Sequence, residues 1–189
     1  MAAALIELGD APAAWAALGF RPDAAGDVAL AGVRLRLTGR GGGILAVRAD
    51  GVTREGPDGL PLGPAAGAEA PAAARHPNGA TAIDHVVALT DSLPRTVAAL
   101  EAAGLDLRRA TEDGRMAFLR LGPFILEVVE RGDGPPALWG LVVVVPALDD
   151  PGPLVGAPKD AVQPGRRIAT VSGEAGLGTA LALMTPRRT

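Results

Sequence analysis

The sequence predicts a mixed α+β fold of repeated βαβββ modules, with curved, antiparallel-rich sheets around a cup-shaped cavity and helices packed outside. Three observations predict it. Strand and helix patterns follow one another in the order βαβββ between residues 83 and 131, and weaker versions of that order lie on both sides. The third is composition, since 189 residues with 48% hydrophobic content can bury a sizeable core.

Residues 1 to 52 are expected to form a first, degenerate module. A short apolar run predicts a strand at Leu5 to Leu8, and a helical pattern ended by Gly19 predicts a helix at Pro12 to Leu18. The alternation Val-Arg-Leu-Arg-Leu predicts a half-buried strand at Val33 to Leu37. Its last strand begins a segment, ILAVRADG from Ile44, that matches ILEVVERG from Ile125 at four of eight positions.

Residues 53 to 80 have the composition of an extended connector. Five prolines lie among Gly and Ala without a sustained apolar period. His76 stands before a proline in this segment, and a histidine in such a loop is more often solvated than a ligand. The sequence therefore predicts a linker with no functional histidine.

Residues 81 to 132 carry the complete pattern. An apolar run rich in β-branched residues predicts a strand at Ile83 to Leu89, and the helical pattern at Ser92 to Ala103 ends at Gly104. Three further strands are predicted at Leu105 to Ala110, Arg115 to Leu121 and Phe124 to Glu130.

Residues 137 to 186 are expected to form a third, degenerate module that pairs with the second. The continuous apolar run from Leu138 to Val145 is typical of a strand covered on both faces. Pro151, Gly152 and Pro153 stand where the second module has its helix, so at most a turn is expected there. Strands resume at Arg166 to Val171 and Ala180 to Thr185.

The motifs IDHVV at residue 83 and ILEVVE at residue 125 resemble a module of the vicinal oxygen chelate superfamily, the group of glyoxalases, bleomycin-resistance proteins and extradiol dioxygenases. The resemblance implies that two modules pair into an open cup, with metal ligands on the first and last strand of each module. It assigns these positions to His85 and Glu127 in the second module, Gly140 and Leu183 in the third, and Ala4 and Ala46 in the first.

Only the second module thus retains side chains that can bind a metal. A divalent metal held by imidazole and carboxylate needs about three or four protein ligands. No cofactor is expected for one chain. A divalent metal remains an alternative if two second modules face each other across a dimer, with His85 and Glu127 as its ligands.

Strand alternation predicts which residues share the cup with the pair. Val87, Val129, Gly140, Val142 and Leu183 are expected to line it as ligand-binding residues. Trp139 matches Asp84 and is expected to point away, toward the helix layer or an interface. Arg166 and Arg167 are consecutive, so one of them faces the cup beside Gln163, and Arg167 is the candidate.

Composition excludes several functions. The absence of cysteine, with only two histidines, leaves no Ser-His-Asp or Cys-His constellation. A net charge of -3, without a Lys/Arg stripe, disfavours nucleic acid. We expect no membrane span or signal peptide, and a cytoplasmic location.

Two functional hypotheses remain, besides a purely structural role. The first is a small-molecule-binding protein with a mostly apolar cup and an incomplete metal site. The second is an enzyme (a lyase, isomerase or dioxygenase), either metal-dependent or with His85 as general base and Glu127 orienting it. We expect a homodimer in which the first module pairs with its symmetry mate or joins the edge of the neighbouring subunit's sheet. The alternative is a monomer in which this module folds back.

Overall fold

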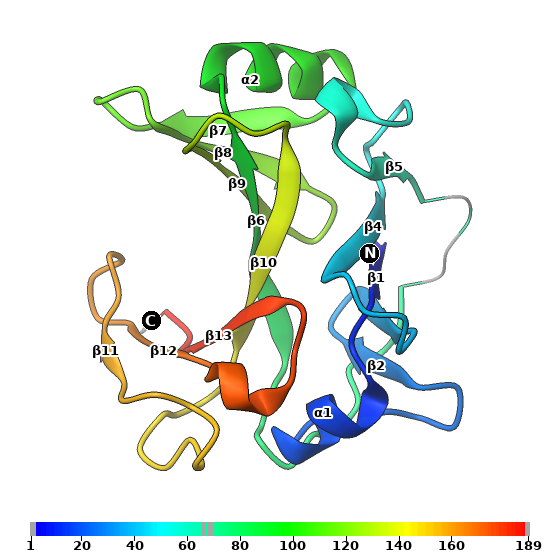
Figure 1. The fold of residues 1–189 in the computed structure, drawn as a ribbon, viewed down its shortest axis with the longest axis vertical. Coiled ribbons are helices and arrows are strands. Elements are labelled where there is room, and N and C mark those ends of the chain that lie inside the picture. Colours follow the sequence, from blue (N-terminus) through cyan, green and yellow to red (C-terminus); the bar gives the residue numbers. More distant parts are fainter. Residues whose placement is uncertain (1–2, 66, 68–69, 188–189) are drawn as a thin grey trace.

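The computed structural model describes residues 3–65, 67 and 70–187 and has the predicted α+β fold. Its strands form a mixed five-stranded sheet, with two parallel and two antiparallel pairings, and an antiparallel-rich eight-stranded sheet, and the helices lie outside them (Figure 1). Within the described residues, no helix is long and apolar enough to cross a membrane.

The second module forms one half of the eight-stranded sheet. Its elements are β6 (Ala82–Thr90), α2 (Leu93–Ala102), β7 (Asp106–Ala110), β8 (Met116–Leu121) and β9 (Phe124–Glu130). The strand order is β7-β8-β9-β6, with β6 parallel to β9. The helix buries Leu93 and Leu100, and Gly104 after it has a φ of 94°, a conformation that glycine adopts without strain.

The third module forms the other half in the corresponding order. Its strands are β10 (Ala137–Val144), β11 (Lys159–Asp160), β12 (Arg167–Thr170) and β13 (Ala180–Met184), ordered β11-β12-β13-β10 with β10 parallel to β13. As predicted, the segment between β10 and β11 contains no helix, and all its residues are described. Antiparallel pairing of β6 with β10 joins the two halves.

The first module has the predicted order of elements but a different strand order. It contains β1 (Ala4–Leu8), α1 (Pro12–Ala17), β2 (Asp27–Leu30), β3 (Val33–Leu37) and β4 (Ile44–Ala49). Its sheet runs β2-β3-β1-β4-β5, and β4 is antiparallel to β1, whereas β9 is parallel to β6. The two similar segments that begin at Ile44 and Ile125 are therefore strands with different pairings.

The segment between the first two modules is more ordered than its composition predicts. It contains η1 (Pro57–Gly59) and β5 (Leu62–Pro64), which pairs with β4 at the edge of the sheet. The expectation of a solvated His76 is wrong, since this residue is only 7% exposed. Its Nδ1 accepts a hydrogen bond from the Arg21 amide at 3.1 Å, and its Nε2 lies 3.0 Å from the Ala29 carbonyl oxygen. His76 therefore fastens the linker to the first module.

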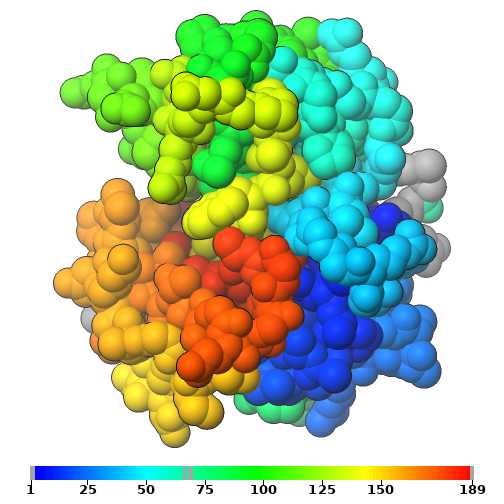
Figure 2. Space-filling view, viewed as in Figure 1, coloured from blue at the N-terminus to red at the C-terminus, as the bar shows by residue number. Residues whose placement is uncertain are grey.

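The first module packs against its own chain, on the back of the eight-stranded sheet (Figure 1). The buried Asp10 carboxylate accepts hydrogen bonds from the Trp15 indole at 3.1 Å and from the amides of Gly178 and Thr179 at 2.7 and 3.2 Å. The first module covers the third module, whose only helix in the described residues is the short 3₁₀ helix η2 (Gly173–Ala175), and the two surfaces meet directly in Figure 2.

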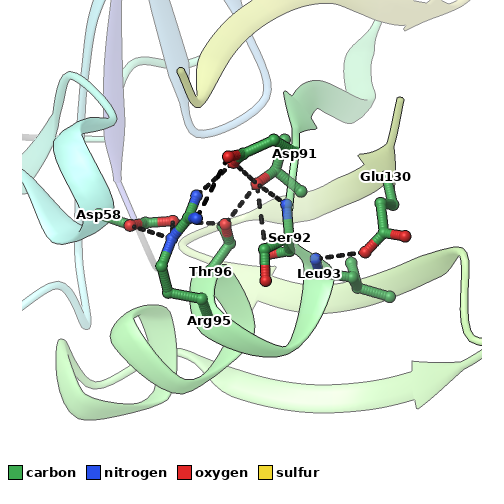
Figure 3. Close-up of polar contacts among 8 residues, drawn as sticks. Asp58, Asp91, Ser92, Leu93, Arg95, Thr96 and Glu130 are labelled. Carbon is green, nitrogen blue, oxygen red and sulfur yellow. Dashed lines mark hydrogen bonds and ion pairs between the residues drawn. The ribbon is translucent and has the colours of Figure 1, made fainter. Parts of the chain in front are cut away.

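A second set of contacts fixes the linker to α2 (Figure 3). Arg95 of α2 pairs with Asp58 of η1 at 2.9 Å and with Asp91, and the Thr96 hydroxyl donates to Asp58. The Thr53 hydroxyl donates to the Ala103 carbonyl oxygen at 3.0 Å. The structure thus has the fold-back arrangement of the first module. The homodimer remains a prediction, which light scattering at micromolar concentration tests.

Candidate functional site

The concave face of the eight-stranded sheet holds a cavity of about 290 Å³, here called the cup. It lies on the side opposite the first module, and its lining is mostly apolar. The lining residues that carry the argument below come from five strands and the segment after β9: His85, Val87, Glu127, Val129, Arg131, Trp139, Val142, Ile168, Thr170 and Ala182. Three of the predicted ligand-binding residues, Val87, Val129 and Val142, are among them.

Two β-bulges shape the cup at the junction of β6 and β10. The pairing skips Trp139 between Leu138 and Gly140 on β10, and skips Asp84 between Ile83 and His85 on β6. A bulge inserts one residue and redirects its side chain. Trp139 consequently lines the cup and is 52% exposed, so the prediction that it points away is wrong.

The bulge at Asp84 creates a chain of four charged or titratable side chains across the two modules. Arg166 of the third module contacts Asp84 through Nη2 and Oδ1 at 2.6 Å. The other oxygen of Asp84 lies 2.8 Å from Nδ1 of His85. Nε2 of His85 lies 3.6 Å from Glu127 Oε2, which is beyond a hydrogen bond. Asp84 and Arg166 thus hold His85 from behind, and its Nε2 lies in the cup beside the Glu127 carboxyl group.

The two carboxyl groups of this chain titrate in opposite directions. Burial raises the pKa of Glu127, and the electrostatic influence of His85 and Arg109 offsets this only in part. Burial also acts to raise the pKa of Asp84, but hydrogen bonds from His85 and Arg166 outweigh it, so the pKa lies below its usual value. Asp84 is therefore the ionised partner of His85, and Glu127 is the carboxyl that takes up a proton more readily.

A pseudo-two-fold relation between the halves identifies the equivalent positions in the third module. Trp139 corresponds to Asp84 and Gly140 to His85, as the sequence predicts, because the β6 and β10 registers map onto each other. Glu127 is opposite Val87 on β6, and its counterpart Ala182 is opposite Val142 on β10.

The predicted counterpart of Glu127, Leu183, is wrong by one residue. Leu183 is 3% exposed and lies in the core behind the sheet. Ala182 faces the cup in its place and has no donor atom. At Gly140 an added Cβ would lie 2.5 Å from the Ala180 carbonyl oxygen, so no side chain fits there. The third module thus contributes no chemically active side chain at either position.

The metal site that the resemblance implies does not fit the residues present. Among the described residues, no three His, Cys, Asp or Glu side chains are arranged to hold a metal ion. His85 and Glu127 offer two donors, and Asp84, the nearest further carboxylate, is engaged by Nδ1 of His85 and by Arg166.

Three further assignments concern β12 and the segment before it. Arg167, the candidate arginine, is exposed outside the cup and donates to the Pro158 carbonyl oxygen at 3.2 Å. Arg166, 3% exposed, is the one that reaches the polar corner. Gln163 lies outside the cup lining, and its carbonyl oxygen accepts from the Arg166 amide at 3.3 Å. Arg166 lies two residues before Ile168 and four before Thr170, and both of these line the cup. Strand alternation from these two residues could therefore have identified Arg166 as the arginine on the cup side.

No family model and no curated protein matches the chain. Solved structures similar to part of it include methylmalonyl-CoA epimerase from Mycobacterium tuberculosis, at 16% identity over 59% of this chain and 91% of that one, with a TM-score of 0.46. A methylmalonyl-CoA epimerase from Streptomyces coelicolor in complex with 2-nitronate-propionyl-CoA is 19% identical over 58% of this chain and 97% of that one, with a TM-score of 0.44. A hypothetical protein from Bacillus halodurans is 17% identical over 57% of this chain and 95% of that one, with a TM-score of 0.41. Likeness at this level carries no argument about ligand or activity.

Proposed function

We propose that this chain is a small-molecule-binding protein of the vicinal oxygen chelate type, in which the cup between the second and third modules holds the ligand. The motifs at residues 83 and 125 support this superfamily, as does the strand order, in which two halves with parallel first and last strands meet at β6 and β10. The five-stranded sheet of the first module closes the back of this unit.

One observation carries the proposal: an apolar cavity contains one polar corner, in which Asp84 and Arg166 hold His85 in position beside Glu127. Ligand sites in proteins are mainly apolar hollows with a few polar groups that fix orientation. The cup has this composition, with Val87, Val129 and Val142 beside His85 and Glu127. Its volume is near the lower end of the range for such sites, so it suits a compact ligand.

Calorimetric titration with 2-naphthylacetamide, an apolar bicycle with one neutral polar group, tests this function. We expect saturable binding to the wild-type chain and its loss in Ala182→Phe, which fills the cup at a partly exposed position. Ala24→Phe, on an exposed turn of the first module, is the matched control and should bind as the wild type does. An Ala182→Phe chain that folds normally and still binds would contradict the proposal.

A second candidate function is metal-independent proton transfer, which the contact between Asp84 and Nδ1 of His85 favours. The ionised Asp84 selects the tautomer with hydrogen on Nδ1, so the lone pair of Nε2 points toward the cup as a base. The 3.6 Å gap to Glu127 leaves room for a ligand atom to approach both groups. Nε2 could then remove a proton from a carbon acid, and Glu127 in its protonated form could return one.

Exchange of α-protons in D₂O, followed by NMR on a panel of aryl ketones, tests this second function. Exchange above the buffer rate that is lost in both His85→Gln and Asp84→Asn would support it. If no ketone that binds in the cup exchanges faster than in buffer, binding without proton transfer is the function that remains.

A further inference from the structure

Arg131 and Trp139 form the outer end of the cup, and they differ from most of its lining in being exposed. Arg131 continues the alternation of the cup face of β9, after Glu127 and Val129. Its amide donates to the Thr90 carbonyl oxygen at 2.8 Å, which extends the pairing of β9 with β6 by one residue. Trp139 enters from β10 on the other side of β6. These two residues are the rim of the cup.

The guanidinium of Arg131 has no carboxylate within ion-pair distance among the described residues. Its neighbour Glu130 is turned to the other side, where it accepts from the Leu93 amide at 2.7 Å (Figure 3). The other arginines near the cup are engaged: Arg109 lies over the Phe118 ring at 4.8 Å, and Arg166 holds Asp84. A permanent positive charge therefore stands available at the rim.

The two polar ends of the cup have different preferences for charge. The inner end carries the Glu127 carboxyl beside His85, so a second negative charge there is unfavourable. The outer end carries Arg131, which favours an anion. Four residues of strand separate Glu127 from Arg131, which is about 13 Å between their Cα atoms. Apolar side chains, Val87 and Val129 among them, lie between these ends.

We infer that the ligand is a compact amphipathic monocarboxylate, with its acid group paired to Arg131, its apolar body against Trp139 and the valines, and a neutral polar group or none at the His85–Glu127 corner. This inference rests on the proposed function, because it names the ligand class and the orientation in the same cup. The aromatic face of Trp139 suits a planar apolar body.

Calorimetric titration with 2-naphthylacetate, compared with its uncharged amide, tests the inference. The wild-type chain should bind the carboxylate about tenfold more tightly than the amide, as expected for a charge-assisted hydrogen bond that solvent weakens. Arg131→Gln should reduce the affinity for the carboxylate to that for the amide, while Arg131→Lys should retain part of the difference. Added salt should weaken binding of the carboxylate and leave binding of the amide nearly unchanged.

Arg40→Gln, which removes another exposed arginine in the first module, is the matched control and should change neither affinity. If the wild-type chain binds both probes equally and Arg131→Gln changes neither, the inference is wrong and the proposed binding function stands. If neither probe binds at millimolar concentration, the proposed function is contradicted and the inference falls with it.

Discussion

The two halves of the cup have the same strand order but unequal chemistry. His85 and Glu127 in the second module correspond to Gly140 and Ala182 in the third. The third module still contributes Arg166, which reaches across the junction to hold Asp84. The comparison shows that one half provides the titratable side chains of the cup, while the other provides apolar surface and the arginine that holds Asp84.

The largest effect is expected from charges placed in the core behind each half. Leu126 and Leu183 are both buried against the shared core, so Leu126→Asp and Leu183→Asp should each lower the free energy of unfolding by about 4 kcal/mol or more. Urea unfolding followed by circular dichroism measures this, with Leu126→Met and Leu183→Met as volume-conserving controls. A stable Leu183→Asp chain would show that this residue faces the cup after all.

The next effect tests the contact that joins the halves. Arg166→Met should lower the free energy of unfolding by about 2 kcal/mol, because it leaves the Asp84 carboxylate without its cation. The value is below that for a fully buried pair, since the Asp84 side chain keeps 21% of its exposure. Arg167→Met is the matched control and should change stability by less than about 0.5 kcal/mol. Equal effects of the two variants would show that the junction contact is not the one described.

These assignments also show what the sequence could and could not predict. Apolar runs and glycines located β6, α2, β8 and β9 to within about two residues, because local patterning governs them. Alternation failed at Trp139 because a bulge breaks the period of two, and no residue pattern marks it. The alignment of the third module with the second was out by one residue in β13, which exchanged Leu183 with Ala182 and so reversed the predicted face of the strand.

The non-local features were the least predictable. The Pro/Ala-rich composition concealed β5 and the burial of His76, both of which depend on pairing with the first module. Element order in that module could not reveal that β4 would be antiparallel to β1. The contact between Arg166 and Asp84 joins residues 82 positions apart, and the sequence alone offered only that one of two arginines would reach the cup.

A smaller effect concerns the pH dependence of the second module's carboxyl groups. The folded-state pKa of Glu127 is raised by burial, so the folded chain binds more protons than the unfolded one between the two values. The free energy of unfolding therefore falls as pH rises through the folded-state pKa of Glu127. Below the unfolded-state pKa, Glu127 is protonated in both states and does not lower it. Glu127→Gln should gain stability over the wild type as pH rises from 4 to 7, measured by urea unfolding.

Asp84 titrates with the opposite sign. Its folded-state pKa is lowered, so its contribution is present above its unfolded pKa and is lost as pH falls through the folded one. Asp84→Asn should therefore lose stability relative to the wild type at neutral pH and approach it in acid. For Glu127, a difference in the free energy of unfolding between the wild type and Glu127→Gln that does not change with pH would contradict the burial of this carboxyl group.

The smallest expected effect is that of a chelator. Within the described residues, the cup offers two donors where a metal needs three or four, so chelator should leave the thermal midpoint unchanged. Elemental analysis of untagged protein purified without chelator is the second measurement. One Zn, Mn, Fe or Ni per chain would contradict this expectation, and His85→Ala and Glu127→Ala would then be the first variants to assay for metal loss.

The most direct test of the polar corner uses the two histidines of the chain as probe and internal control. His85 lines the cup, whereas His76 lies in the linker with both ring nitrogens engaged. Imidazole ¹H–¹⁵N spectra, assigned with His76→Gln, would be recorded while 2-naphthylacetamide is added to saturation. The account predicts that the His85 resonances shift and those of His76 do not. Unmoved His85 resonances, or shifts confined to His76, would contradict ligand binding at this corner.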